Sequence, residues 1–199
     1  MEYIVLAGLW IGWCAAHSAL ISLTVTDYLK ARLRSGYRFY RLFYNAFALL
    51  SLLPVISYGA GLKGQAIFVW DGPWAILRAA LAATAAGLFI AGGRKYDMLQ
   101  MLGIRQIMTG KAPAALTAAG TLDTTGILGL TRHPWYLAAI ILIWAGPREV
   151  YAPTLVVNII LTVYVVIGTV LEERKLAAEF GEEYRAYQRR VPMLLPWRR

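Results

Sequence analysis

Two short groups of polar residues interrupt an otherwise apolar half of the chain. The first is the segment Arg132–Tyr136, which reads Arg-His-Pro-Trp-Tyr, and the second is Glu172-Glu173, which follows after two apolar segments. Ionisable groups at the ends of membrane helices are costly to place there and by default indicate a functional site. The pairing of these two groups therefore predicts where the chemistry of the protein takes place.

The residue types in this pair suit the binding of a charged cofactor. A helix that begins at Pro134 would present free backbone N–H groups to an anionic group. His133 and Tyr136, three residues apart, would add hydrogen bonds from one face. A carboxylate of Glu172 or Glu173 could meet a cation at the membrane boundary. The simpler interpretations are an interfacial anchor for the first group and a solvated helix start for the second.

The positions of these groups depend on apolar segments long enough to cross a membrane. The chain has 199 residues, of which 59% are hydrophobic, and its mean hydropathy is +0.53. Long apolar runs predict an all-α integral membrane helical bundle rather than a soluble domain. We expect one domain over residues 1–199, with three N-terminal spans in 1–92 and a cofactor-binding half in 93–199.

About five apolar stretches are predicted to be transmembrane helices, followed by an amphipathic cytoplasmic helix at the C-terminus. The fourth stretch is short, because its residues cover about 20 Å as a helix and the hydrocarbon core is roughly 30 Å thick. It therefore either begins earlier, near Thr124, or forms a hairpin with the fifth stretch across Gly146-Pro147. The stretches are Tyr3–Val25, Phe43–Leu62, Trp74–Gly92, Pro134–Gly146 and Pro153–Leu171.

The distribution of basic residues predicts the orientation of the chain. All of the 20 basic residues except Lys63, Arg78 and Arg148 fall on the connections that follow the first, third and fifth spans. This positive-inside pattern places the N-terminus outside and the C-terminus in the cytoplasm, in what we expect is a bacterial inner membrane. The net charge of +9 is thus a topology signal. Contact with anionic membrane lipids is a second effect, and no nucleic acid is expected as a partner.

Several common site motifs are missing from the sequence. Cys14 is the single cysteine, and the two histidines, His17 and His133, are far apart, so no metal site is predicted. Neither a Gly-x-Gly-x-x-Gly sequence after a strand nor a Walker loop is present. A Rossmann nucleotide site and a soluble methyltransferase fold are therefore not indicated.

The C-terminal helix, predicted from residue 172 to residue 189, carries one apolar face. Gly181 lies inside it, where a glycine costs about 1 kcal/mol relative to alanine. We therefore expect another group to approach the backbone closely at this glycine. The apolar face consists of Leu176, Phe180, Tyr184 and Tyr187.

Polar residues also occur in the first two spans. His17-Ser18 lies inside the first span, and Tyr44-Asn45 begins the second. A histidine is one of the few intramembrane groups that can take a proton near neutral pH. His17, Tyr44 and Asn45 therefore predict a polar substrate pocket near the cytoplasmic side. The alternative is that His17 is a structural residue that bonds a backbone carbonyl.

The C-terminal motifs together resemble a known superfamily of membrane enzymes. R-H-P-x-Y at 132–136 is followed by E-E-x-x-L-x-x-x-F-G-x-x-Y-x-x-Y at 172–187, V-P at 191–192 and then Pro196. In order, spacing and membrane context this is similar to the isoprenylcysteine carboxyl methyltransferase and phospholipid methyltransferase superfamily, whose members use S-adenosylmethionine. The similarity covers about residues 120–197.

The rest of the chain resembles one branch of that superfamily, the NnrU proteins and the methanethiol S-methyltransferases. The similar residues are His17-Ser18, Y-R-x-x-Y-N at 40–45, Tyr96-Asp97 and G-x-R-Q at 103–106. The branch resemblance implies a small thiol as the methyl acceptor.

The resemblance also implies roles for individual residues. The cofactor would be S-adenosyl-L-methionine, with S-adenosyl-L-homocysteine as its product. Arg132, Glu173 and His17 would take part in catalysis, with His17 receiving the proton of a thiol. The implied cofactor contacts are His133, Pro134, Tyr136, Glu172, Leu122, Gly126, Ile127, Leu128 and Gln106.

Two positions depart from the isoprenylcysteine enzymes. Gly168 stands where those enzymes have an arginine that contacts the prenylcysteine carboxylate, four residues before Glu172. Leu128 stands in place of a pocket tyrosine. The missing arginine favours a small or neutral acceptor, such as methanethiol or hydrogen sulfide.

Methylation of a small thiol is therefore the expected function, and three alternatives stay open. A lipid or prenyl-thiol acceptor predicts an open lateral groove between spans. A non-enzymatic NnrU-like protein of nitrogen-oxide metabolism predicts that His133, Tyr136 and Glu172 do not converge. A membrane reductase of related architecture, like the sterol reductases, would bind the phosphate of NADPH at the basic link from Arg94 to Lys111.

Overall fold

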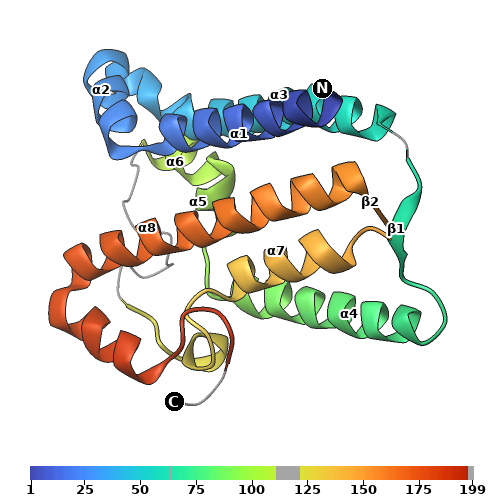
Figure 1. Ribbon diagram of the computed structural model, residues 1–199. Coiled ribbons are helices and arrows are strands. Elements are labelled where there is room, and N and C mark those ends of the chain that lie inside the picture. The colour runs from blue at the N-terminus through green and yellow to red at the C-terminus, as the bar shows by residue number, and fades with distance from the viewer. Residues whose placement is uncertain (63, 111–121, 197–199) are drawn as a thin grey trace. The chain divides into compact units, whose positions relative to one another are not determined.

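The computed structural model of the protein describes residues 1–62, 64–110 and 122–196 (Figure 1). Within these ranges the chain is mostly helical, with two short strands. The all-α membrane bundle predicted from the long apolar runs is confirmed.

The chain divides into two compact units. The first consists of Met1–Gly64 with Asp97–Leu116, and the second consists of Gln65–Tyr96 with Thr117–Arg199. The predicted division of the chain at residue 92 is not where the units separate. The third apolar helix packs with the C-terminal elements and therefore belongs to the second unit.

The first unit contains the two N-terminal apolar helices, α1 and α3, which pack along each other. The first predicted span ends sooner than expected, because Ser22 has an extended backbone and caps a separate helix, α2, through its side chain. The elements of this unit are α1 (Glu2–Ile21), α2 (Leu23–Leu33), the 3-10 helix η1 (Arg34–Phe39), α3 (Tyr40–Gly61), α5 (Met98–Leu102) and α6 (Ile104–Thr109).

Helix α5 is attached to the beginning of α3. The carbonyl of Met101 accepts hydrogen bonds from Arg41 Nε at 3.2 Å and from Asn45 Nδ2 at 3.0 Å. Gly103 has a φ of +88°, and a Cβ atom there would lie 2.7 Å from the backbone nitrogen of Leu42. Only glycine fits this close approach. The Y-R-x-x-Y-N group at 40–45 and the G-x-R-Q group at 103–106, which both resemble the NnrU branch, thus pack against each other.

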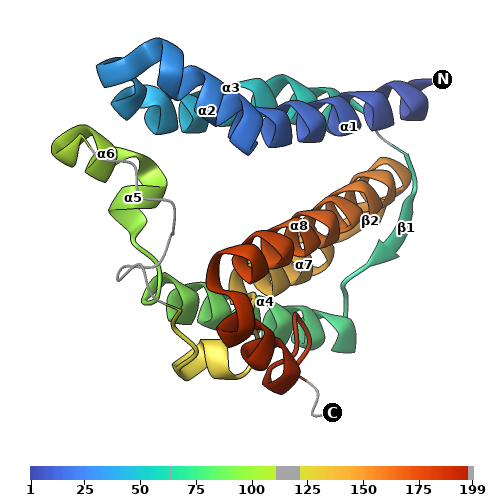
Figure 2. The same cartoon turned by 90° about the vertical axis from the view of Figure 1, so that its left-hand side faces the viewer.

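The second unit is built around α4, α7 and α8, which lie together in Figure 2. Trp135, which follows Pro134 in the first motif, packs against α4 and joins it to α7. A Cβ atom at Gly92 would lie 2.4 Å from the Trp135 indole, whose Nε1 donates to the Phe89 carbonyl at 3.0 Å. The elements are β1 (Ala66–Val69), α4 (Pro73–Gly93), the 3-10 helix η2 (Gly126–Gly129), α7 (Pro134–Ala145), β2 (Glu149–Tyr151) and α8 (Ala152–Arg190).

Arg78, the arginine inside the third predicted span, caps the end of α7. Its Nε donates to the carbonyl of Ala145 at 2.9 Å, and its Nη2 donates to the carbonyl of Gly146 at 2.6 Å. These carbonyls have no partner within their own helix, and a cation also complements the helix dipole there. The charge of Arg78 is therefore satisfied by the neighbouring helix.

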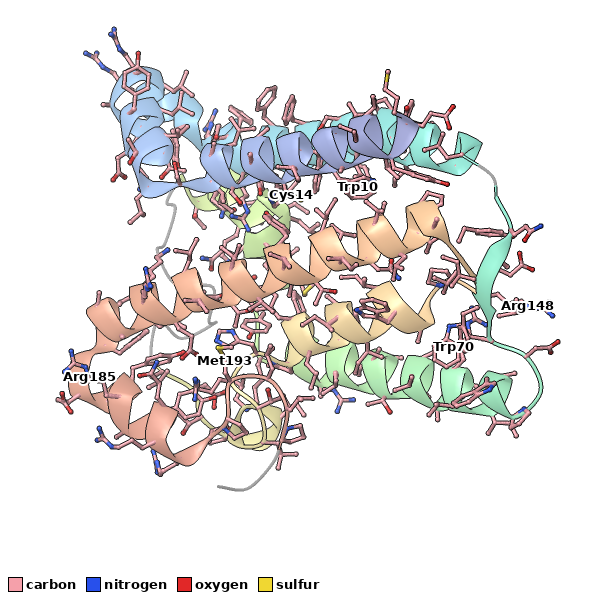
Figure 3. The ribbon with its side chains drawn as sticks, in the orientation of Figure 1. Trp10, Cys14, Trp70, Arg148, Arg185 and Met193 are labelled. Atoms are coloured by element: carbon pink, nitrogen blue, oxygen red, sulfur yellow. The ribbon has the colours of Figure 1, made fainter. Side chains whose placement is uncertain are left out.

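A two-stranded antiparallel sheet, which was not predicted from the sequence, joins two connecting segments of the second unit. Ala66 of β1 is opposite Tyr151 of β2, and Phe68 is opposite Val150. The pair brings the segments that precede α4 and α8 to the same end of this unit. Figure 3 labels Trp70 and Arg148 at this end, where the backbone N–H of Trp70 donates to the backbone carbonyl of Arg148 at 3.0 Å.

Helix α8 turns back on itself at Gly181. This residue has φ +57° and ψ −129°, values outside the helical region, and the chain beyond it folds back beside the preceding part of α8 (Figure 2). The expectation of a close approach at Gly181 is wrong, because no atom of the described residues lies within 4 Å of where its Cβ would be. The positive φ, which side chains disfavour, is the reason for a glycine at this position.

The apolar face predicted for the C-terminal helix packs together across this turn. The segment after Gly181 places two tyrosines against apolar residues of the segment before it. The cluster consists of Tyr184, Tyr187 and Val191, with Leu122, Leu176, Ala177 and Phe180 packed against it.

Four helical stretches among the described residues are long and apolar enough to cross a membrane. They are Glu2–Ile21, Leu23–Gly61, Pro73–Gly93 and Ala152–Arg190. The fifth apolar helix, α7, has 12 residues and is therefore about 18 Å long. It begins at Pro134, so the alternative of an earlier start near Thr124 is wrong. The hairpin with α8 is what the structure has.

Candidate active site

Arg132 joins the beginning of α7 to both parts of α8. Its Nε donates to Oε1 of Glu173 at 2.8 Å, and its Nη2 donates to Oε2 at 2.6 Å. Its Nη1 donates to the carbonyls of Gln188, at 3.1 Å, and Val191. The two charged side chains are only 8% and 9% exposed. The guanidinium is thus fully engaged in a paired, buried contact.

The carboxylate of Glu173 is saturated with hydrogen bonds. Besides those from Arg132, it accepts from His133 Nε2 at 2.7 Å, from the Tyr184 hydroxyl at 2.6 Å and from Gln188 Nε2 at 2.7 Å. A carboxylate has about four lone-pair sites. Glu173 therefore has no capacity left for a ligand, and it fixes the orientation of its neighbours.

His133 lies between the two adjacent carboxylates of α8. Because a carboxylate only accepts, we place the hydrogen of the ring on Nε2, which donates to Glu173. The other ring nitrogen, Nδ1, lies 4.0 Å from Oε2 of Glu172. The His133 ring also stacks on Tyr136, with the centroids 5.5 Å apart and the planes at 21°. Three residues predicted to contact the cofactor therefore converge.

The surroundings of Glu172 differ from those of Glu173. The Glu172 side chain is 31% exposed, and its carboxylate interacts electrostatically with Tyr136. Across the described ranges of the chain, no lysine or arginine nitrogen lies within 4.0 Å of its carboxylate. Of the two adjacent acids, Glu172 is therefore the one with no lysine or arginine beside it in the described part of the chain.

Two further tyrosines interact with Glu172 or with Tyr136. Tyr96 interacts electrostatically with Glu172 and with Tyr136, and Tyr164 interacts with Tyr136. The Tyr96 ring also contacts Trp135 edge to face, with the centroids 4.9 Å apart. Burial and the charge of Glu172 raise the pKa of Tyr96 to about 12. The Tyr96 hydroxyl is therefore neutral at physiological pH.

The segment before α7 pairs with the end of the chain. The N–H of Arg132 donates to the carbonyl of Pro192 at 3.0 Å. The N–H of His133 and the hydroxyl of Thr131 both donate to the carbonyl of Met193, at 3.2 Å. Figure 3 labels Met193 at this place. These bonds set the direction in which the His133 side chain leaves the backbone.

The loop predicted to line the cofactor pocket also holds the C-terminal segment. Leu128 is buried, and its carbonyl accepts a hydrogen bond from the Tyr187 hydroxyl at 2.6 Å. Leu122 packs in the apolar cluster of Tyr187. Pro134, the first residue of α7, is fully buried. These contacts with protein groups position the first motif next to α8.

A charged network fixes the start of the same loop. Lys95 Nζ donates to Oδ2 of Asp123 at 2.9 Å and to the Thr125 hydroxyl at 2.8 Å. The Asp123 carboxylate also accepts a hydrogen bond from the backbone N–H of Thr125. The bond from Lys95, as the larger cause, and this backbone bond lower the pKa of Asp123 to about 2. Gly126 has φ +63° and lies against the Lys95 stem, and the carbonyl of Ile127 accepts two backbone bonds that close η2.

The substrate residues predicted in the first two spans lie in the first unit. His17 Nε2 and the Tyr44 hydroxyl are 2.7 Å apart, so this predicted pair is brought together. Trp13 stacks on the His17 ring at 5.0 Å. The amide nitrogen of Asn45 instead donates to Met101 and anchors α5.

Gln106, another predicted cofactor residue, is also in the first unit. Its side chain is buried, and Nε2 donates to the carbonyl of Gln100 at 3.0 Å. Within the part of the chain that the structure describes, its Oε1 atom has no hydrogen-bond partner. One acceptor of Gln106 therefore remains for another group.

Three residues around Glu173 and Glu172 were not predicted as site residues. Tyr184 and Gln188 donate to Glu173 only because Gly181 reverses the helix, and this reversal has no signal in the hydrophobic pattern. Tyr96 follows α4 and reaches Glu172 through tertiary packing alone. No group of three or more metal-binding side chains occurs among the described residues.

The fold and the buried cluster at the start of α7 define a helical integral membrane protein with a polar site where α7 begins. The chain belongs to the NnrU protein family, whose model matches residues 5–195. The predicted relation to the NnrU and methanethiol S-methyltransferase branch is confirmed. No solved structure matches the chain.

Several relatives are methanethiol S-methyltransferases. The protein of Pseudomonas deceptionensis is 36% identical over 110 residues, which are 55% of this chain and 41% of that protein. Methanethiol S-methyltransferase 1 of Bradyrhizobium diazoefficiens is 48% identical over 68 residues, 34% of this chain and 24% of that protein. The Mycobacterium tuberculosis protein is 34% identical over 98 residues, 49% and 39% of the two chains. The matched part thus spans less than half the length of each relative.

Proposed function

We propose that the protein is an S-adenosylmethionine-dependent methyltransferase of the membrane, and that it methylates the sulfur of a small thiol. The observation that carries this proposal is the convergence of His133, Tyr136 and Glu172. The similarity to methanethiol S-methyltransferases supports the reaction type.

The residues at this site suit a ligand that is both cationic and amphipathic. Glu172 offers a carboxylate with no lysine or arginine beside it in the described part of the chain. Tyr136 and Tyr96 interact electrostatically with this carboxylate, and Tyr164 interacts with Tyr136. S-adenosylmethionine carries an ammonium group and a sulfonium group, and both are cations that such a site would stabilise.

The methyl donor would supply an electrophilic methyl carbon. The acceptor sulfur would give an electron pair to this carbon while the bond between the carbon and the sulfonium sulfur breaks. The electron pair of the broken bond stays on the departing thioether, which is neutral. Most of the rate enhancement would come from alignment and from the exclusion of water, because the leaving thioether needs no proton. His133 and Glu172 would hold the donor in place. Arg132 and Glu173, predicted as catalytic residues, take a positioning role in our proposal, because their polar atoms already bind one another and their neighbours.

A thiol acceptor must also lose its proton, since the thiolate is the nucleophile. His17, bonded to Tyr44, remains our proposal for the group that receives it. Gln106, whose Oε1 accepts no hydrogen bond from the described residues, remains proposed as a further cofactor contact. Both assignments rest on the chemistry of these side chains within the first unit.

A small acceptor is favoured by the environment of Gly168. This residue lies one helical turn before Glu172, and no atom from the part of the chain that the structure describes lies within 4 Å of where its Cβ would be. It therefore provides no cation for an acceptor carboxylate. We propose methanethiol or hydrogen sulfide as the acceptor, and an inner-membrane orientation with the N-terminus outside and the C-terminus in the cytoplasm.

The proposal is tested by calorimetric titration of the detergent-purified chain with S-adenosylhomocysteine, with NADPH as a parallel ligand. Saturable binding of S-adenosylhomocysteine alone is expected. Headspace analysis with S-adenosylmethionine and methanethiol should then detect dimethyl sulfide. NADPH binding alone would replace the proposal with the reductase alternative, and binding of neither would favour a non-enzymatic protein. Methylation of a prenyl thiol but not of methanethiol would favour the lipid alternative.

A further inference from the structure

We propose that the connection between α1 and α3, residues 22–39, is a docking surface for the head groups of anionic phospholipids. The connection consists of Ser22, α2 and η1, and it lies within the first unit. The proposal concerns how this part of the chain contacts the membrane. It goes beyond the methyl-transfer reaction and does not depend on it.

The connection begins and ends at the same end of a helix pair. Helix α1 ends at Ile21 and α3 begins at Tyr40, and each lies in a helical stretch long and apolar enough to cross a membrane. The Tyr40 hydroxyl donates to the carbonyl of Leu20 at 2.7 Å, which holds the start of α3 beside the end of α1 (Figure 1). Residues 22–39 are therefore placed where a bilayer that contains both helices meets water.

Four exposed basic side chains follow one another along this connection, which contains a single acid, Asp27. They are Lys30, Arg32, Arg34 and Arg38. Lys30 Nζ lies 3.6 Å from Asp27, in a pair whose two side chains are 50% and 67% exposed. For the three arginines, no carboxylate oxygen among the described residues lies within 4.0 Å. The surplus positive charge is therefore available to an anion outside the protein.

Exposed aromatic rings lie beside two of these cations. The guanidinium carbon of Arg32 is 5.5 Å from the centre of the Tyr28 ring, and that of Arg38 is 4.8 Å from the Phe39 ring. Tyr28 is 59% exposed and Phe39 is 46% exposed, and neither α2 nor η1 contains a buried residue. A ring that reaches toward the acyl chains and a cation that stays at the phosphates suit the boundary of a bilayer.

The chemistry of the head group follows from these side chains. A guanidinium binds two phosphate oxygens at once, and a lipid with a net negative charge adds no ammonium group that would repel it. An acidic protein segment would match the charge alone, whereas an anionic bilayer matches both the charge and the exposed rings. Each basic residue near an anionic membrane surface raises the affinity about 5-fold.

The test is native mass spectrometry of the full chain in an uncharged detergent, titrated with phosphatidylglycerol and with phosphatidylcholine of the same acyl chains. The wild type should bind phosphatidylglycerol at least about 10-fold more tightly. The double variant Arg32→Gln, Arg38→Gln should lower this ratio by at least about 5-fold. The double variant Arg32→Lys, Arg38→Lys keeps the charge and should keep most of the preference.

A matched control removes the same charge from the C-terminal part of α8. Arg185 and Arg189 are exposed, and each lies within 4.0 Å of the Glu182 carboxylate, which already offsets their charge. The double variant Arg185→Gln, Arg189→Gln should therefore change the ratio of the two dissociation constants by less than about 2-fold. An equal fall in the control would overturn the proposal, because net charge alone would then explain the preference.

Two further results would overturn the proposal. One is an equal affinity of the wild type for the two lipids, after which an acidic protein segment would be the better match for the charge. The other is an unchanged ratio in the glutamine double variant. If that variant fails to fold, the single variants Arg32→Gln and Arg38→Gln decide, since each should lower the ratio about 2- to 5-fold.

Discussion

Arg132 and Glu173 are joined by two hydrogen bonds of 2.8 and 2.6 Å, in a contact where both side chains are more than nine-tenths buried. The same carboxylate binds His133, so the ion pair and the candidate cofactor site share one atom, Oε1 of Glu173. The stability of the fold-back of α8 and the geometry of the site are therefore coupled.

Breaking this pair should destabilise the protein strongly. Glu173→Gln or Arg132→Lys leaves a buried charge without its full set of partners, and the expected loss is about 3–5 kcal/mol. The measurement is the melting temperature in detergent. Glu182→Gln, which removes an exposed pair with Arg185, is the matched control and should change stability by less than about 1 kcal/mol. Equal losses of stability at the two positions would show that the buried pair contributes no more to stability than the exposed pair does.

Glu172 and His133 should affect binding rather than folding. Glu172→Gln removes the carboxylate that we assign to the cation, and the affinity for S-adenosylhomocysteine should fall about 10- to 100-fold, the usual effect of losing a charged hydrogen bond. His133→Ala should act in the same direction. Calorimetry of variants with a normal gel-filtration profile provides the measurement. Wild-type affinity in either variant would contradict the site assignment.

Gly181 should be intolerant of a side chain because of its backbone conformation. Gly181→Ala places a Cβ on a residue with φ +57°, and we expect a loss of about 1–2 kcal/mol. Gly168→Ala is the control on the same helix, since its surroundings are equally open. There the helix propensity of alanine should leave stability unchanged or raise it by up to about 1 kcal/mol. A Gly181→Ala variant as stable as the wild type would argue against the reversal.

Gly92 should be intolerant for a different reason, which is the lack of space. Gly92→Ala would place a Cβ 2.4 Å from Trp135 and force α4 and α7 apart. We expect a lower melting temperature, by an amount that corresponds to about 1–3 kcal/mol. Gly87→Ala on the same helix serves as the control, because none of the described residues comes within 4 Å of where the Cβ of residue 87 would be. A similar melting temperature for both variants would show that the two helices do not meet at Gly92.

The Lys95–Asp123 pair should contribute stability in a defined range of pH. The pKa of Asp123 is lowered to about 2, whereas a free aspartate has a pKa of about 3.9. Its contribution is therefore full above about pH 4 and is lost as the pH falls toward 2. The Asp123→Asn variant should have a lower melting temperature than the wild type at pH 7 and at pH 5. The loss in free energy of unfolding should be at most about 1 kcal/mol, because the pair is partly exposed. The difference should shrink at pH 3, and a difference that grows there would contradict the assignment.

The apolar runs and the motif order were enough to predict the helical class and the places of the apolar helices, and they singled out His133, Tyr136 and Glu172, which the structure brings together. Such features are local: burial in lipid requires long apolar stretches, and the starts and ends of helices follow from residues such as Pro134. The family relation also follows from the order of residues along the chain, as the match over residues 5–195 confirms.

The different surroundings of the two adjacent acids were decided by tertiary structure alone. Glu172 and Glu173 are the same residue type, yet Glu173 is saturated by five donors from Arg132, His133, Tyr184 and Gln188, and Glu172 has no lysine or arginine beside it among the described residues. The difference arises because Gly181 reverses α8 and brings Tyr184 and Gln188 back onto one carboxylate. The backbone conformation of this single residue sets the reversal, and hydrophobic periodicity carries no information about it.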